Sequence, residues 1–180
     1  MHGMVFAELR NYGETKHGKG TWDALLRNAG LQGKTYLPVQ DYPDMELVAM
    51  VKAASSMTGL PVDNILEGFG EFIVPALLKM FGHLLLAEWR TIDVIDHTEG
   101  TVHTAVRVRN AGAKPPKLQT VRRGPDEVVL VYTSPRQMCA FAIGIGKGLA
   151  QHFGEHVIAT QTSCMHQGAS RCEIVFRKVK

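Results

Sequence analysis

This sequence of 180 residues has no apolar run long enough to cross a membrane. Its longest apolar stretches, residues 73–78 and 84–87, are far shorter than the roughly 20 residues that a membrane-spanning helix needs. The first ten residues also lack the basic stretch and long apolar run of a secretory signal. We therefore expect a cytoplasmic protein that does not associate with membranes.

Charge is also scarce, and neither sign dominates. Charged residues make up 21% of the chain, and 20 basic against 17 acidic side chains give a formal net charge of +3. The basic residues are scattered and do not form the stripe that a nucleic-acid partner needs. The three cysteines are odd in number, which does not suggest a secreted disulfide framework.

Repeats, long linkers and low-complexity segments are missing as well, which predicts one domain over residues 1–180. Apolar residues make up 45% of the chain, a proportion close to that of ordinary globular proteins. Catalytic motifs do not stand out: we find no credible pair of carboxylates, no phosphate loop and no Ser/His/Asp arrangement. We therefore expect a regulatory or binding protein and not an enzyme.

What the sequence does contain is a series of segments with helical apolar spacing, separated by glycines and prolines. Thr21 is expected to cap the second segment, and Pro75 to lie in the first turn of the fifth. Residues 91–108 fit a helical face, although residues 101–108 also alternate like a strand, and we favour a helix. The expected helices cover residues 5–12, 21–30, 45–57, 61–69, 72–86 and 91–108.

After residue 112 the pattern changes to short strands. Residues 118–122 and 127–133 predict a hairpin, and residues 157–165 and 171–179 predict a second strand pair. Residues 138–153 between the pairs predict a helix whose glycines permit close packing. The order is therefore several helices followed by ββαββ. This is an α+β fold in which a helical part packs on a four-stranded antiparallel sheet.

The most informative local pattern is Tyr132-x-Ser134-x-Arg136, at the end of the second expected strand. If the strand continues through it, the three side chains point to one face, because alternate residues of a strand do so. A phenol, a hydroxyl and a guanidinium that converge can hold a carboxylate. A pattern this short is also typical of an ordinary solvated strand end.

A histidine earlier in the chain could act together with this carboxylate-binding motif. The combination suggests haem, because haem needs anchors for its propionates and an axial ligand for its iron. Of eight histidines, His103 stands out because its neighbours are apolar and it precedes the segment that carries the motif. His97 is the second choice, since it would point to another face of the helix and lies among acidic residues.

His103, the Pro115-Pro116 pair and the Tyr-x-Ser-x-Arg motif together resemble the H-NOX family, the haem nitric oxide/oxygen-binding domains. The opening Met-His-Gly-Met-Val and the segment Glu-Gly-Phe-Gly-Glu-Phe at 67–72 are also similar to that family, so the resemblance covers nearly the whole chain. It implies a haem b between the helical part and the sheet, with His103 as the proximal iron ligand.

The same resemblance implies roles for other residues around that haem. The three side chains of the motif would bind the propionates, and Pro116, or else Pro115, would press on the porphyrin and distort it. Val5 and Leu9 would lie near the distal side. Family members that bind oxygen stably carry a distal tyrosine nine residues after the motif tyrosine, where this chain has Phe141. Without that donor, the resemblance implies binding of nitric oxide and carbon monoxide and discrimination against oxygen.

The resemblance also implies how a signal would leave the site. Nitric oxide bound opposite His103 would weaken the iron–histidine bond, free the helix that carries His103 and change a nearby surface. We expect a stand-alone sensor that signals to a separate protein. The family suggests a histidine kinase or a cyclic-di-GMP enzyme as that protein.

Cys139, Cys164 and Cys172 form a second candidate site, since the last two bracket the turn of the second strand pair. Three thiolates suit tetrahedral zinc with a fourth ligand, and their spacing resembles a zinc-bearing H-NOX branch. That branch has a histidine where this chain has Gln161, so His166 or water would be the fourth ligand. A redox-active Cys164–Cys172 pair and three inert buried thiols are the alternatives.

The alternative function is a haem-free zinc or thiol redox switch, or a small-molecule-binding regulator. The end of the chain is similar to vinyl-reductase-type domains, whose order is also ββαββ. A colourless protein that contains zinc and has no Soret band would favour this alternative, whereas a coloured protein would favour the haem sensor.

Overall fold

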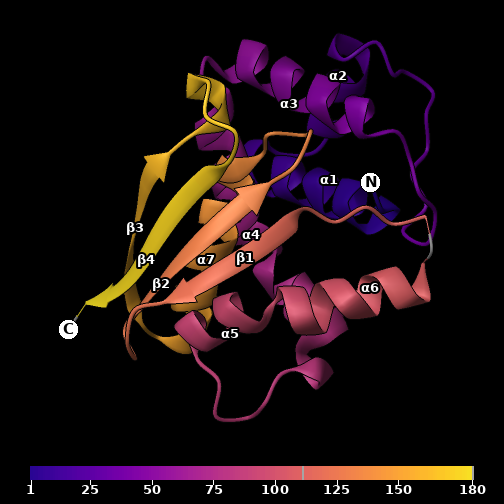
Figure 1. Cartoon of the computed structure of the whole chain (residues 1–180). Helices are drawn as coiled ribbons and strands as arrows, with labels where there is room; N and C mark the ends of the chain where they lie inside the picture. The colour runs from indigo at the N-terminus through magenta and orange to yellow at the C-terminus, as the bar shows by residue number, and fades with distance from the viewer. Residues whose placement is uncertain (111, 180) are drawn as a thin grey trace.

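Helices occupy the first part of the chain and the sheet the last part, as the computed structural model of residues 1–110 and 112–179 shows (Figure 1). This confirms the predicted α+β order. The first six helices are α1 (Gly3–His17), α2 (Thr21–Asn28), α3 (Asp44–Thr58), α4 (Val62–Phe81), α5 (Thr91–His97) and α6 (Thr104–Arg109). The ββαββ unit consists of β1 (Lys117–Arg122), β2 (Glu127–Thr133), α7 (Cys139–Phe153), β3 (His156–Ser163) and β4 (Cys172–Val179).

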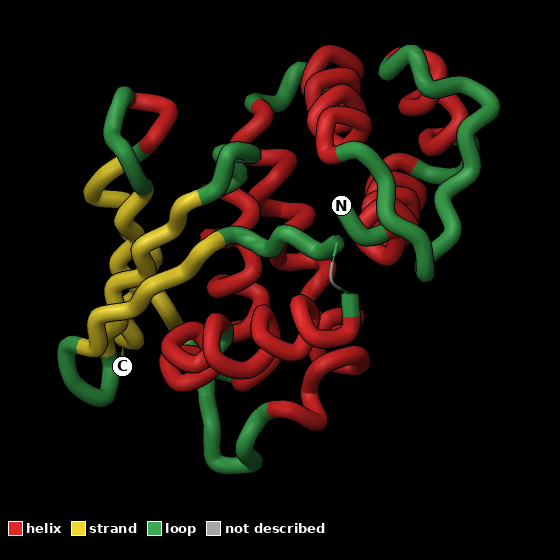
Figure 2. Tube along the Cα trace, turned by 45° about the vertical axis from the view of Figure 1, so that its right-hand side comes forward, coloured by secondary structure: helices red, strands yellow, loops and turns green. Residues whose placement is uncertain are grey.

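The four strands form one antiparallel sheet in the order β1-β2-β4-β3. Tyr132 of β2 lies opposite Leu118 of β1 on one side and Cys172 of β4 on the other. Helix α7 joins the central strand β2 to the edge strand β3, and it packs on one face of the sheet with α4 behind it (Figure 1). The strands lie together on one side of the molecule and the long helices on the other (Figure 2).

Two hydrophobic clusters meet at the α4–α7 contact. One cluster lies among α1 to α4, and the other lies between the sheet, α5 and α7. The two helices approach closely because glycines face each other: a methyl group added at Gly144 would lie 2.9 Å from Cα of Gly70. The prediction that the glycines of this helix permit close packing is thereby confirmed. Helix α7 is packed closely between α4 and the sheet.

The predicted break between residues 69 and 72 is wrong, because a single helix, α4, runs through it. Pro75 consequently lies in the interior of a helix and not in its first turn. A proline there leaves the carbonyl of Glu71 without its usual donor. That carbonyl faces Gly148 of α7, which is close enough that no side chain would fit between them.

The segment 91–108 is helical, as favoured, but it has three parts. Between α5 and α6 lies a π-helical turn, Glu99–His103, in which the N–H of His103 bonds to the carbonyl of Thr98 at 3.0 Å. The turn includes Gly100, and glycine is among the poorest helix formers.

Two further details differ from or add to the sequence predictions. The N-cap of α2 is Gly20, whose φ of 87° suits glycine, and Thr21 is the first helical residue. The hydroxyl of Thr21 donates to the carbonyl of Gly18 at 2.7 Å, so it still fixes the start of the helix.

Within the described residues, no helix has the length and apolar character that a membrane crossing requires.

Candidate functional site

A cavity of about 740 Å³ lies where the helical part meets the sheet. Pockets that enclose ligands the size of a drug are typically about 300–1,000 Å³, so this one can hold a large organic group. Apolar side chains from α1, α4, α6, α7 and the first two strands make most of its wall. Among the residues that line it are Val5, Leu77, Val102, Val106, Phe141, Ile145 and Leu149.

His103 lies in the wall of this cavity, at the end of the π-helical turn, with its side chain 15% exposed. Its Nδ1 lies 2.9 Å from Oε2 of Glu99. An ionised carboxylate only accepts hydrogen bonds, so Nδ1 carries the proton and Nε2 has the lone pair that a metal requires. Burial lowers the pKa of His103 below its usual value, against the opposing effect of Glu99.

His97, the second choice for a metal ligand, is directed elsewhere. Its ring stacks on Trp89 with a centroid separation of 4.4 Å, and its Nδ1 lies 2.9 Å from the carbonyl oxygen of Asp93. It does not line the cavity. Of these two histidines, His103 lines the cavity and His97 points away from it.

The Tyr-x-Ser-x-Arg motif is placed differently from the sequence expectation. Strand β2 ends at Thr133, so Ser134 and Arg136 lie in a turn and strand alternation does not align them with Tyr132. Tyr132 and Arg136 line the cavity, whereas Ser134 is buried outside its lining. The hydroxyl of Ser134 accepts the backbone N–H of Arg136 at 3.2 Å, which holds the turn in place.

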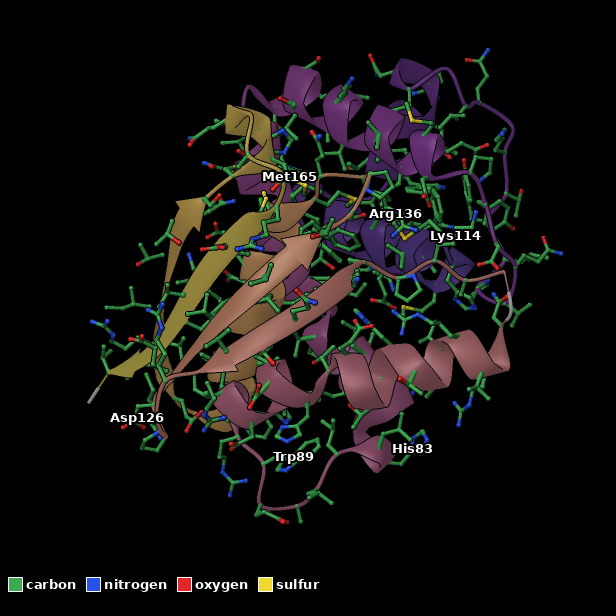
Figure 3. All side chains as sticks on the ribbon, in the orientation of Figure 1. His83, Trp89, Lys114, Asp126, Arg136 and Met165 are labelled. Atoms are coloured by element: carbon green, nitrogen blue, oxygen red, sulfur yellow. The ribbon has the colours of Figure 1, made fainter. Side chains whose placement is uncertain are left out.

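Arg136 faces a carboxylate, as the motif suggested, but the carboxylate belongs to the chain itself. Its Nε donates to Oδ2 of Asp44 at 2.6 Å. Its Nη2 donates to the carbonyl of Lys114 at 2.6 Å, and Figure 3 labels both Arg136 and Lys114. Asp44 also lies 2.8 Å from the N-terminal ammonium group of Met1. Burial acts to raise the pKa of Asp44, but the two cations together hold it below its usual value. The cavity wall thus presents a guanidinium that is already oriented toward anions.

A sequence model described as haem-NO-binding matches residues 2–161 of the chain. The chain belongs to the haem-NO-binding (H-NOX) family. The domains of this family are haem-based sensors of nitric oxide, carbon monoxide or oxygen; they are not themselves catalytic and they signal to effectors such as cyclases. The fit to haem is supported by this chain's own geometry: a large apolar cavity, a half-buried histidine whose Nδ1 is held by a carboxylate, and an arginine directed at a carboxylate.

Known structures agree with the H-NOX fold. The H-NOX protein of S. oneidensis in the Fe(II)NO state matches with a TM-score of 0.92 and 22% identity over 100% of both chains. The Fe(II) unliganded H-NOX protein of K. algicida matches with a TM-score of 0.87 and 19% identity over 100% of this chain and 97% of its own.

A curated relative is the soluble guanylate cyclase gcy-31 of Caenorhabditis elegans, 22% identical over 138 residues, which are 76% of this chain. This chain matches only 20% of the length of that cyclase.

Other residues that the H-NOX resemblance singled out fall into two groups. Val5, Pro115, Pro116 and Phe141 line the cavity. Leu9 does not line it: one turn further along α1, it is only 3% exposed and packs in the core among the first four helices.

The three cysteines of this H-NOX chain lie together. The sulfur atoms of Cys139, Cys164 and Cys172 are all within 4.8 Å of one another, which is compatible with one shared ion. His166 is not part of this group, because its Nε2 lies 2.7 Å from the carbonyl oxygen of Gln137. Gln161 lies beside Cys139, and its Nε2 donates to the carbonyl of Ser163 at 3.2 Å. The fold thus assembles three soft ligands and leaves the fourth position without a histidine.

Two residues beside the site were missed from the sequence. Glu99 has a signal that could have been found, since it precedes His103 by one helical turn and i,i+4 side chains meet on a helix. Asp44 has none, because it lies 92 residues from Arg136 and only the fold brings them together.

Proposed function

We propose that this H-NOX protein senses nitric oxide, with carbon monoxide as a second ligand, at a ferrous haem b whose iron is bound by His103. The proposal is carried by one observation: His103 lies in the wall of a large, mostly apolar cavity with its Nδ1 held by a carboxylate. When bound, haem supplies the metal that takes the gas. The chain supplies the axial ligand, the anchors and the pocket.

At the other end of the cavity, Arg136 and Tyr132 are proposed to hold the propionates. The guanidinium is only 12% exposed and already binds the carboxylate of Asp44, so a propionate would share or replace that partner. Ser134 would act indirectly, since its hydroxyl fixes the backbone of Arg136. Pro116 is the proposed contact with the porphyrin face beside His103.

Discrimination against oxygen is supported by the hydrogen bonding of the cavity wall. Phe141 lines the cavity and has no donor. Of the two tyrosines in the wall, Tyr42 donates its hydroxyl to Oε1 of Gln40 at 3.2 Å, and Tyr132, whose hydroxyl accepts the N–H of Met138 at 3.2 Å, is one of the proposed propionate anchors. Bound oxygen needs a hydrogen-bond donor far more than nitric oxide or carbon monoxide does. Nitric oxide and carbon monoxide are therefore the preferred ligands.

The signal is proposed to leave through α6. Release of His103 would free the helix that follows it, and a partner protein would read the changed surface. A histidine kinase or a cyclic-di-GMP enzyme remains the predicted partner from the resemblance.

A His103→Gly variant tests the assignment, with His97→Gln as the matched control. The variant should lose the five-coordinate ferrous spectrum of the wild type and regain it when imidazole is added, while the control should keep it. An unaltered ferrous spectrum of His103→Gly without imidazole would overturn the assignment.

A Phe141→Tyr variant tests the ligand preference separately. The added hydroxyl should allow a stable oxygen complex in air, seen in the visible spectrum, with nitric oxide and carbon monoxide binding retained. If the wild-type protein itself forms a stable oxygen complex, the preference proposed here is wrong.

The cysteine cluster supports a second proposal, that zinc binds Cys139, Cys164 and Cys172 with water in the fourth position. Their proximity is the observation that favours it. The wild type should contain about one zinc per chain by metal analysis, and Cys164→Ser should lose it. A zinc-free protein that forms a Cys164–Cys172 disulfide on mild oxidation would support the redox alternative instead.

A further inference from the structure

We propose that Glu99 is the positioning residue that sets how strongly His103 binds the haem iron and that ties His103 to the sheet. This inference rests on the proposed role of His103. It concerns a residue beside the site that neither the motif nor the apolar pattern of the helix marks.

The carboxylate of Glu99 receives donors from three different parts of the fold. Its Oε2 binds Nδ1 of His103 at 2.9 Å and the backbone N–H of Leu118 at 3.1 Å. Its Oε1 binds Nη2 of Arg107 at 2.6 Å. These partners belong to the π-helical turn, to β1 and to α6 respectively. Both oxygens are therefore occupied, and the carboxylate has a fixed orientation.

The backbone of Glu99 is fixed as well. Its carbonyl accepts the hydroxyl of Thr104 at 3.0 Å, a contact five residues along the chain. The bond from the N–H of His103 to the carbonyl of Thr98, five residues earlier, has the backbone spacing of a π-helix. Such turns are frequent at functional sites, because they shift a side chain relative to the rest of its helix. The π-helical turn thus begins at Glu99 and ends at His103.

A carboxylate on Nδ1 changes what Nε2 can do. It fixes the tautomer and the ring orientation, and its negative charge makes the imidazole a stronger electron donor to a metal. Arg107 competes for the same negative charge from the other oxygen, with its own side chain 40% exposed. Two changes should therefore have opposite effects. Removal of the charge of Glu99 should make His103 a weaker electron donor to the metal, and removal of Arg107 should make it a stronger one.

The link to Leu118 gives the same residue a role in transmission. Leu118 belongs to β1, and its own side chain lines the cavity. Through Glu99, a displacement of His103 acts on the first strand as well as on α6. The positioning residue therefore couples the iron ligand to both elements that border it.

Resonance Raman spectra of the ferrous, haem-loaded protein test this proposal, with the iron–histidine stretching frequency as the readout. Glu99→Gln should lower the frequency, and Arg107→Gln should raise it. The control is Asp96→Asn, a nearby carboxylate that pairs with Arg122 and does not contact His103, and it should leave the frequency unchanged. In Glu99→Gln, the affinity of His103 for the iron should fall by about 10- to 100-fold, seen as a larger fraction of protein whose His103 is displaced when nitric oxide is bound.

The outcomes separate this inference from the proposed function. If the wild type shows no iron–histidine stretch, both fail. If His103→Gly abolishes the stretch but Glu99→Gln leaves it unmoved, only the role of Glu99 is overturned. Shifts of the same sign in Glu99→Gln and Arg107→Gln would also overturn it, because general loosening and not charge would explain them. If Glu99→Gln does not fold, Arg107→Gln decides alone: a rise supports the proposal, and a fall or no change refutes it.

Discussion

The contact between α4 and α7 should be intolerant of a single methyl group, and Gly144→Ala tests this. A methyl group at this position would lie 2.8 Å from the carbonyl carbon of Glu67 and 2.9 Å from Cα of Gly70. Both neighbours are backbone atoms of a helix that cannot rotate away as a side chain would, so the two helices must separate. We therefore expect a loss at the upper end of the range for overpacking, which is roughly 1–3 kcal/mol.

The gain in helix propensity offsets only part of that loss. Replacing glycine by alanine inside a helix stabilises it by roughly 0.5–1 kcal/mol. The net destabilisation is then about 2 kcal/mol, and in a chain of this size it should lower Tm by roughly 4–8 °C. Chemical unfolding followed by circular dichroism gives the free energy, and a thermal scan gives Tm.

The control is Gly82→Ala, in the short turn after α4. Gly82 has a φ of −58°, and a methyl group there would meet no atom within 4 Å. This variant should be neutral or more stable by about 0.4–1 kcal/mol, because it only restricts the unfolded chain. A Gly144→Ala protein as stable as the wild type would refute the reasoning, since it would mean that the helices are not in backbone contact.

Three further predictions concern Arg136, the buried carboxylate of Glu46 and the cysteine cluster. Arg136→Met should speed haem loss to a myoglobin acceptor by about ten- to a hundredfold, since hydrogen bonds to charged groups contribute roughly 1.5–3 kcal/mol, whereas Arg171→Met should not. Burial acts to raise the pKa of Glu46, but its hydrogen bonds hold the pKa lower than usual, so its stabilisation is present above the unfolded value of about 4.3 and is lost as pH falls below it. Glu46→Gln should therefore flatten the acid side of the unfolding free energy, and a parallel pH profile would contradict this. Burial and then Cys172 raise the pKa of the Cys139 thiol to about 12, so in metal-free protein at pH 8 iodoacetamide should label the partly exposed Cys164 well before Cys139.

The order of elements and the place of the candidate site followed from local sequence patterns, because those patterns reflect local rules. Apolar periods of helix and strand identified the ββαββ unit, and the spacing of Cys164 and Cys172 around one turn predicted that they meet. The break assigned near Gly70 failed for a tertiary reason. The glycine there serves the contact with α7, and the helix continues because both of its neighbours are already helical.

The carboxylate partner of Arg136 could not be predicted, for the same kind of reason. A guanidinium on a turn predicts an anion, but not which anion, and Asp44 begins a helix 92 residues away. The prediction that strand alternation aligns the motif failed because β2 ends after Tyr132 and Thr133, so a turn and not a strand presents Arg136. Local sequence patterns thus identified the residues of the site, but not the partner residues and the turn that hold them in place.

The two ends of the cavity differ in how firmly the fold holds them. Tyr132 is 3% exposed in the central part of the sheet, and Arg136 is bonded both to α3 and to the segment before β1. The six residues of α6 that follow His103 include none that is buried, and a π-helical turn with no buried residue connects them to α5. Segments with few buried contacts open at low free energy, while those in the core open only with the whole protein. A group that bridges the two ends would therefore be fixed at Arg136 and able to move with His103. The carboxylate of Glu99 is bonded to both α6 and β1, so it would be the first contact through which such a movement reaches the sheet.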